Sequence, residues 1–139
     1  MSTAEEQRQR APLCVLVVDD SPIMRKMVIR SLEVAGFDLG GVEQAAHGGE
    51  ALGVLERVLP DLMLCDVHMP AMDGVQLVRT LAKQRRIASL PVVMISSERN
   101  DAQRAELLTL GARGYLHKPF YPEALGEVVR QVLRRTATS

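Results

Sequence analysis

Five short apolar runs, separated by longer segments of helical periodicity, limit the folds open to this chain of 139 residues. Each run is continuously apolar and does not alternate with polar residues, which is typical of parallel strands covered on both faces. The runs lie at Leu13–Val18, Val42–Ala46, Leu62–Cys65, Val92–Ile95 and Gly114–Leu116. Their spacing predicts that a helix follows every strand and returns the chain to the same end of a sheet.

The segments between the runs carry signals for the starts and ends of helices. Ser21 is expected to cap the first helix and Pro22 to lie in its first turn, with Gly36 closing it. The other helices are expected over Glu50–Val58, from Asp73, from Asn100 or Asp101 to Gly111, and from Pro122 to about Arg135. This alternation predicts an α/β fold with a doubly wound five-stranded parallel sheet and five helices. Residues 13–135 form one domain, between a polar arm (1–12) and a polar tail (136–139) that we expect to be frayed.

The composition of the chain limits the partners that it can be expected to bind and the cell compartment in which we expect it. Seventeen basic and seventeen acidic residues cancel, so the overall charge does not point to nucleic acid or to an anionic membrane. No stretch approaches the roughly 20 apolar residues that span a bilayer, and the N-terminus lacks the apolar segment of a secretory signal. Cys14 lies early in one run and Cys65 at the end of another, so we expect two free thiols in a reducing cytoplasm.

Polar residues follow four of the five predicted strands at the point where each strand ends. These residues are Asp19, Asp20, Asp66, Ser96 and Lys118. Each one alone could be a helix cap or a loop residue, but the carboxyl ends of parallel strands meet at one edge, where sites form. Three ionised carboxylates in one cleft repel one another and favour a bound cation, and Mg²⁺ prefers oxygen ligands. A carboxylate, a divalent ion, a lysine and a hydroxyl together suit phosphoryl transfer to an aspartate.

Four segments of the sequence resemble the signature segments of response-regulator receiver domains. They are VLVVDDSPIMRKMV, DLMLCDVHMPAMDG, VVMISSE and GARGYLHKPF, and the resemblance extends over nearly the whole chain. The resemblance implies a flavodoxin-like or CheY-like fold with strand order 2-1-3-4-5. It also implies a two-component phosphoacceptor, phosphorylated by a sensor histidine kinase, that signals by docking to a partner protein. Chemotaxis, motility and development all stay open as pathways.

The same resemblance implies a role for each residue of the site. Asp66 would accept the phosphoryl group, Asp20 would bind Mg²⁺ directly, and Asp19 would act mostly through a bound water. His68 would give its backbone carbonyl to the metal. Ser96 would move to grip the phosphoryl group. A lysine would pair with the phosphoryl group beside Asp66 and Ser96.

Lys118 is that lysine, and the resemblance implies a cis peptide bond between Lys118 and Pro119. Tyr115 matches an aromatic position that turns inward on activation, so Ser96 and Tyr115 would form the switch. The downstream partner would dock on the face made by the helix ending near Gly111, the strand Gly114–Leu116 and the helix beginning at Pro122. We expect no direct nucleic-acid or membrane partner, and a monomer or weak homodimer. The chain would catalyse only its own phosphorylation and dephosphorylation.

Several other functions fit parts of the pattern. A phosphatase of the haloacid dehalogenase type would need a second acid two residues after Asp66, where this chain has His68, and a cap region that is absent here. Neither of the glycine-rich nucleotide-binding fingerprints occurs. A receiver fold that is never phosphorylated is an alternative, although the expected site residues are intact. An excised receiver of a larger regulator is another, although the polar ends suit a free-standing protein.

His68 departs from the family, which often has Asn at this position, and its side chain would lie near the path of an attacking water. We therefore predict that His68→Asn changes the lifetime of the phosphoaspartate. The measurement is the dephosphorylation rate of the two proteins after removal of the phosphodonor. An unchanged rate would contradict a role for this side chain.

Overall fold

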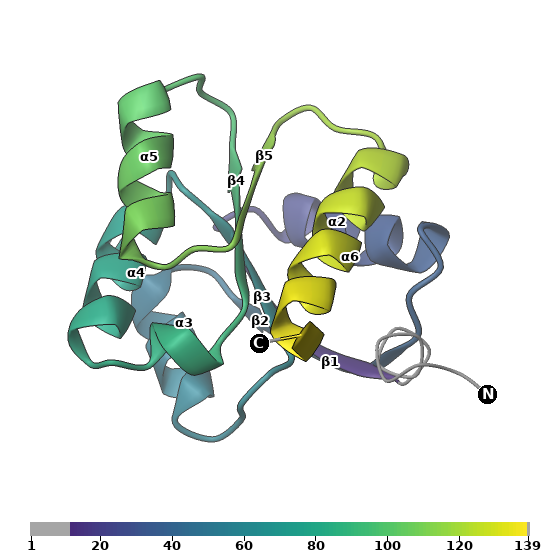
Figure 1. Cartoon of the computed structure of the whole chain (residues 1–139), viewed down its shortest axis with the longest axis horizontal. Helices are drawn as coiled ribbons and strands as arrows, with labels where there is room; N and C mark the ends of the chain where they lie inside the picture. Colours follow the sequence, from purple (N-terminus) through teal and green to yellow (C-terminus); the bar gives the residue numbers. More distant parts are fainter. Residues whose placement is uncertain (1–11, 139) are drawn as a thin grey trace.

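The computed structural model describes residues 12–138, which form one parallel five-stranded sheet with helices on both faces (Figure 1). The strand order is β2-β1-β3-β4-β5, as the resemblance implied, and every neighbouring pair is parallel, as the sequence predicted. The strands are β1 (Leu13–Val18), β2 (Leu39–Ala45), β3 (Leu62–Asp66), β4 (Val92–Ser96) and β5 (Gly114–His117). The predicted fold class is therefore confirmed.

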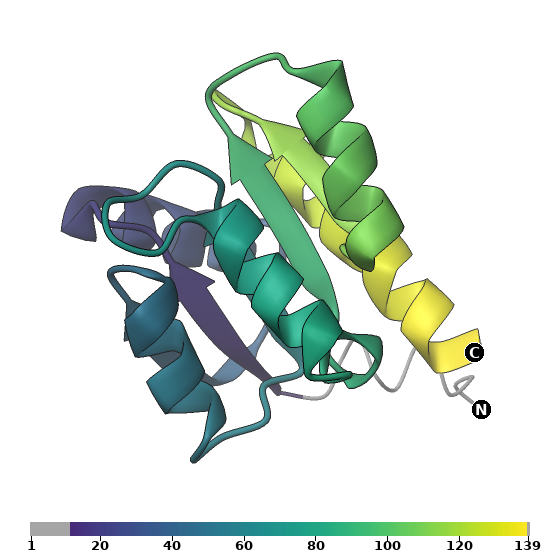
Figure 2. The same ribbon diagram turned by 90° about the vertical axis from the view of Figure 1, so that its left-hand side faces the viewer.

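Five α-helices connect or follow these strands within residues 12–138. They are α2 (Pro22–Val34), α3 (Gly48–Leu55), α4 (Gly74–Lys83), α5 (Asp101–Leu110) and α6 (Pro122–Thr138), with a short 3-10 helix η1 (Ile87–Ser89) before β4. Helices α2 and α6 cover one face of the sheet, and α3, α4 and α5 cover the other (Figures 1 and 2). None of the helices in this part of the chain has the length and apolarity needed to cross a bilayer.

The two faces of the sheet build two separate apolar cores, which explains why the strand sequences are continuously apolar. Leu16 and Val18 of β1 point into the core beneath α3, α4 and α5. Val15 and Val17 of the same strand point into the core beneath α2 and α6. All four side chains are at most 1% exposed. Burial on both faces removes the alternation that a strand with one wet face would show.

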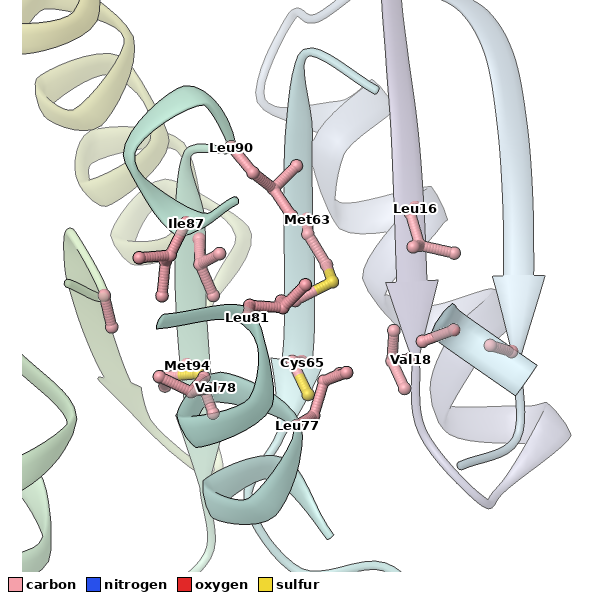
Figure 3. Packing of buried hydrophobic residues seen from close by; sticks show 14 of the residues in the cluster. Leu16, Val18, Met63, Cys65, Leu77, Val78, Leu81, Ile87, Leu90 and Met94 are labelled. Atoms are coloured by element: carbon pink, nitrogen blue, oxygen red, sulfur yellow. The ribbon is translucent and has the colours of Figure 1, made fainter. Parts of the chain in front are cut away.

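Helix α4 shows how the predicted helical face packs on the sheet. Leu77, Val78 and Leu81 are fully buried and lie against Met63 and Cys65 of β3 (Figure 3). Their spacing of one, three and four residues places them on one side of the helix. Burial of this face fixes α4 beside the carboxyl end of β3.

Most of the predicted helix ends are confirmed by their capping contacts. The Ser21 hydroxyl accepts the Met24 N–H at 3.2 Å, and the backbone at Gly36 has a positive φ of 99°. Asp73 forms a reciprocal capping box at the start of α4, and Asn100 caps α5. Helix α6 continues to Thr138, three residues beyond the predicted end, while residues 1–11 of the predicted arm and Ser139 lie outside the described residues.

The predicted bounds of two elements, β2 and α3, were wrong, and glycines lie near the start of each. Strand β2 begins at Leu39 and not at Val42, because pairing with β1 carries Gly40 and Gly41 in the strand despite their low strand propensity. Helix α3 begins at Gly48 and ends at Leu55, where we expected Glu50–Val58. His47 caps it, since its Nδ1 accepts the Glu50 N–H at 3.3 Å.

The two cysteines are free, as predicted. Cys65 pairs in register with Val18 at the end of β1, whereas Cys14 lies at the start of that strand. Burial is the main reason why the pKa of the Cys65 thiol is raised, and the nearby Asp66 carboxylate raises it further. The thiol therefore stays protonated. Cys65 is therefore a small apolar core residue.

Candidate functional site

The parallel sheet brings the predicted polar residues together at one edge. Asp19 and Asp20 follow β1, Asp66 ends β3, Ser96 ends β4, and Lys118 follows β5. The registers of these four neighbouring strands place their carboxyl ends side by side. Strand β2 lies at the far side of β1 and contributes none of the predicted residues.

Three carboxylates form the centre of the site. Oxygens of Asp19, Asp20 and Asp66 all lie within 4.8 Å of one another. Asp19 is 4% exposed and Asp66 is 7% exposed, whereas Asp20 lies at the surface. Oxygen donors at this spacing, two of them buried, are the ligand set that a hard divalent cation takes.

Burial raises the pKa of Asp66 above its ordinary value, and the neighbouring carboxylate of Asp19 raises it further. The Lys118 ammonium acts in the opposite direction, both through its charge and through its hydrogen bond to Asp66. The backbone N–H of His68, which donates to Asp66, also lowers this pKa. Since burial is the largest cause, the ionised Asp66 carboxylate is less stable here than in water.

Lys118 is the cation that the chain itself supplies. Its Nζ lies 3.2 Å from Oδ2 of Asp19 and 3.4 Å from Oδ1 of Asp66, so that it bridges the two buried acids. Its backbone N–H donates to the Ser96 carbonyl at 2.7 Å, which ties the end of β5 to the end of β4. The peptide bond to Pro119 is cis, as the resemblance implied.

Ser96 is fully buried, and its hydroxyl is engaged by its own loop. The hydroxyl donates to the Glu98 carbonyl and accepts the Glu98 N–H, both at 3.1 Å. A role in gripping a phosphoryl group therefore requires the hydroxyl to donate to an incoming phosphoryl oxygen in place of the Glu98 carbonyl.

The loop after Asp66 is held close to the site by Gly74. The Gly74 N–H donates to the Val67 carbonyl at 2.9 Å, and a Cβ at this position would lie 2.4 Å from the Asp66 carbonyl oxygen. Only glycine permits this approach, so α4 begins directly against the backbone of Asp66. His68, in the same loop, is exposed, and its Nε2 lies 3.5 Å from a Glu98 carboxylate oxygen.

Tyr115 of β5 lies partly buried on the side of the sheet covered by α5. Its hydroxyl is buried and has no hydrogen-bond partner among the described residues. The guanidinium of Arg104 lies over the ring, 5.7 Å from its centroid. The predicted switch residue therefore has one polar atom unsatisfied and one cation on its face.

Three residues near the site were missed by the sequence reasoning. Arg25 donates to the Asp19 carbonyl at 2.6 Å and to the Gln44 side chain at 2.8 Å, so it ties β1 to β2 beside the acids. Glu98 holds both the Ser96 hydroxyl and the His68 side chain, and Arg104 stacks on Tyr115. Arg25 could have been noticed because it lies one turn into the helix after the paired acids, but Glu98 and Arg104 carry no such signal.

Comparison with known proteins agrees with this geometry. Residues 15–130 match the family model described as the response regulator receiver domain. Response regulator Rre1 of Synechocystis sp. is 37% identical over 128 residues, which are 92% of this chain and 54% of that protein. The DNA-binding dual master transcriptional regulator RpaA of the same organism is 36% identical over 124 residues, 88% of this chain and 49% of that protein. The chain spans about half the length of these curated relatives.

Solved structures match over nearly their whole length. The chemotaxis response regulator CheY4 of Vibrio cholerae has a TM-score of 0.75 at 36% identity, covering 88% of this chain and 99% of that one. The receiver domain of the Francisella response regulator 1452 has a TM-score of 0.77 at 31% identity, covering 89% and 98%. The chain belongs to the response regulator receiver domain family.

Proposed function

We propose that this chain is a phosphoacceptor of two-component signalling, in which Asp66 takes a phosphoryl group from a sensor histidine kinase. The observation that carries the proposal is the setting of the Asp66 carboxylate. It is 7% exposed, stands beside two further carboxylates, and lies 3.4 Å from the Lys118 ammonium. Burial and neighbouring acids leave this carboxylate in need of positive charge, which a phosphoryl-transfer site must also supply.

The three carboxylates fit Mg²⁺ by donor type and by spacing. In the proposed site Asp20 and Asp66 bind the ion directly, together with the His68 backbone carbonyl, and Asp19 contributes through a water. Bound Mg²⁺ would neutralise charge on the acids and on the phosphoryl oxygens during transfer. The Lys118 ammonium pairs with two of the three carboxylates, which leaves room for a divalent ion in the charge balance.

In the proposed reaction an oxygen of Asp66 attacks the phosphorus of the kinase phosphohistidine. An O–P bond forms while the P–N bond breaks, and its electron pair returns to the imidazole nitrogen. Lys118 stabilises charge on the phosphoryl oxygens, and the Ser96 hydroxyl donates to one of them once it leaves the Glu98 carbonyl. Attack of water on phosphorus later breaks the bond between phosphorus and the Asp66 oxygen, releases inorganic phosphate and restores the carboxylate. We propose no other substrate, and hence no further enzymatic activity.

The proposed signal passes from the phosphoryl group to the face formed by α5, β5 and α6. Movement of Ser96 toward the phosphoryl group opens space behind it, and Tyr115 turns into that space. The unsatisfied Tyr115 hydroxyl supports two positions for the ring, because a buried unpaired hydroxyl costs about 1–3 kcal/mol. The partner protein then docks on the altered face, and the chain works in the cytoplasm as a monomer or weak homodimer.

A second arrangement follows from the lengths of the relatives. Since RpaA is named as a DNA-binding regulator and is about twice as long as the matched region, this receiver could act within a longer regulator. In that case the docking partner would be another domain of the same protein. The chemistry proposed for Asp66 is the same in both arrangements.

We predict that acetyl phosphate gives a phosphoryl adduct that requires both Mg²⁺ and Asp66. Intact-mass analysis of wild type and Asp66→Asn, each with Mg²⁺ and with EDTA, measures it. The adduct is expected in wild type with Mg²⁺ and in none of the other three samples. An equal adduct in Asp66→Asn would assign the reaction to another residue, and no adduct in wild type would favour a receiver fold that is not phosphorylated.

We also predict that Asp66→Asn raises the free energy of unfolding in EDTA at neutral pH. Because the folded pKa of Asp66 is raised, stability from this group is complete below the unfolded pKa and is lost as pH rises through the folded pKa. The advantage of the variant should therefore shrink as pH falls toward the unfolded carboxyl pKa of about 4. Urea unfolding of both proteins across this range measures it.

Mg²⁺ should reverse the order of the two proteins in the same assay. A ligand bound only by the folded state stabilises it by about 2.7 kcal/mol at one hundred times its Kd, and Asp66→Asn has lost one ligand. If Asp66→Asn is instead less stable than wild type in EDTA at neutral pH, burial and the neighbouring acid do not destabilise the ionised Asp66 carboxylate as proposed.

A further inference from the structure

Arg104 and Tyr115 together form a wall between two hollows on the α5–β5–α6 face. Both residues line a hollow near the site, which is bounded on its other sides by Glu98, Arg99 and His117. Both also line a second hollow of about 340 Å³ farther along β5. A change in either side chain therefore reshapes both hollows.

The second hollow, called here the arginine groove, runs around the edge strand of the sheet. Figures 1 and 2 show α5 and α6 on opposite sides of β5, and the groove is lined from all three elements. Its lining residues are Arg104, Leu108, Arg113, Gly114, Tyr115, Val128, Gln131, Val132 and Arg135. Leu108 is 40% exposed and stands one helical turn after Arg104 on α5.

The charge of the arginine groove indicates what it binds. Its lining contains three arginines and no acidic residue, while Leu108 and Val128 add apolar surface. The hollow nearer the site is different, because Glu98 and Asp101 accompany Arg99 and Arg104 there. Arg104, with the exposed Leu108 one turn away, complements an acidic peptide segment that carries an apolar side chain, because a guanidinium group pairs with a carboxylate in bidentate fashion.

We propose that Arg104 is a latch that links the state of Tyr115 to the binding of an acidic segment of a partner protein in the arginine groove. The inference rests on the proposed function. Before phosphorylation the Arg104 guanidinium lies on the Tyr115 ring, 5.7 Å from its centroid. When Tyr115 turns inward, the guanidinium loses the ring and takes a partner carboxylate instead. Phosphorylation thus changes both the shape of the groove and the availability of one of its cations.

The latch can be followed directly because the chain has only two tyrosines and no tryptophan. Protein labelled with 3-fluorotyrosine gives two ¹⁹F resonances, and Tyr121→Phe assigns them. Beryllofluoride with Mg²⁺, a phosphoryl mimic, should move the Tyr115 resonance. Arg104→Gln without beryllofluoride should move it part of the way, since an exposed cation–π contact changes an equilibrium by about 2- to 5-fold.

Arg99→Gln is the matched control for this shift. It removes the same charge from the same face, but Arg99 lines only the hollow nearer the site. This variant should leave the Tyr115 resonance in place. A Tyr115 resonance that is unmoved in Arg104→Gln, or moved equally in Arg99→Gln, overturns the latch.

Binding is measured by fluorescence anisotropy with a fluorescein-labelled peptide of glutamates around a central leucine. Wild type should bind this peptide more tightly with beryllofluoride than without. Arg104→Gln should lose that gain, Arg104→Lys should keep part of it through its charge, and Arg99→Gln should keep it. An undiminished gain in Arg104→Gln overturns the inference, and so does self-association of the chain on beryllofluoride in place of peptide binding.

The proposed function and the latch fail in different ways. Absence of a Mg²⁺-dependent adduct on Asp66 overturns the proposed function and the latch with it. A normal adduct on Arg104→Gln, together with a wild-type response of both Tyr115 and the peptide, overturns the latch alone. A normal adduct with a displaced Tyr115 resonance and a lost peptide gain supports both.

Discussion

The Lys118 ammonium, set between the buried carboxylates of Asp19 and Asp66, is the interaction on which the rest of the site depends. Two acids that are less than one-tenth exposed are held together against their repulsion, and Asp20 adds a third carboxylate within 4.8 Å. The sheet makes this possible, because its parallel strands bring three distant parts of the chain to one edge. A divalent ion can supply further positive charge, which the phosphoryl oxygens in a transition state of phosphoryl transfer also need.

In the proposed mechanism, the same arrangement carries a change at Asp66 to the surface. Lys118 is joined through its backbone to Ser96, and the Ser96 hydroxyl is held only by the loop at Glu98 among the hydrogen bonds found in residues 12–138. On the neighbouring strand β5, where it pairs in register with Met94, Tyr115 is packed under Arg104, and its hydroxyl has no partner among the described residues. The two-state switch proposed for Ser96 and Tyr115 requires that these side chains exchange one set of contacts for another.

Much of the fold could be predicted because its signals are local and repeated. Continuous apolar runs give buried parallel strands, and capping residues such as Ser21 and Asp73 mark helix starts that the structure confirms. The topology then gathers Asp19, Asp66 and Lys118 without further information. The start of β2 was missed because Gly40 and Gly41 belong to the strand through its pairing with β1, and not because glycine favours strands. Arg104 was missed because its contact with Tyr115 joins two elements, and helical spacing alone does not reveal which exposed arginine lies over a ring.

The identity of the phosphorylated residue is the central claim, and reductive trapping tests it most directly. Borohydride reduces the acyl phosphate of a phosphoaspartate to homoserine, which tandem mass spectrometry of the peptides locates in the sequence. After incubation with acetyl phosphate and Mg²⁺, we expect homoserine at position 66 and aspartate at positions 19 and 20. Homoserine at either of those two positions, or a phosphoryl group carried by His68 with Asp66 unmodified, would contradict the account.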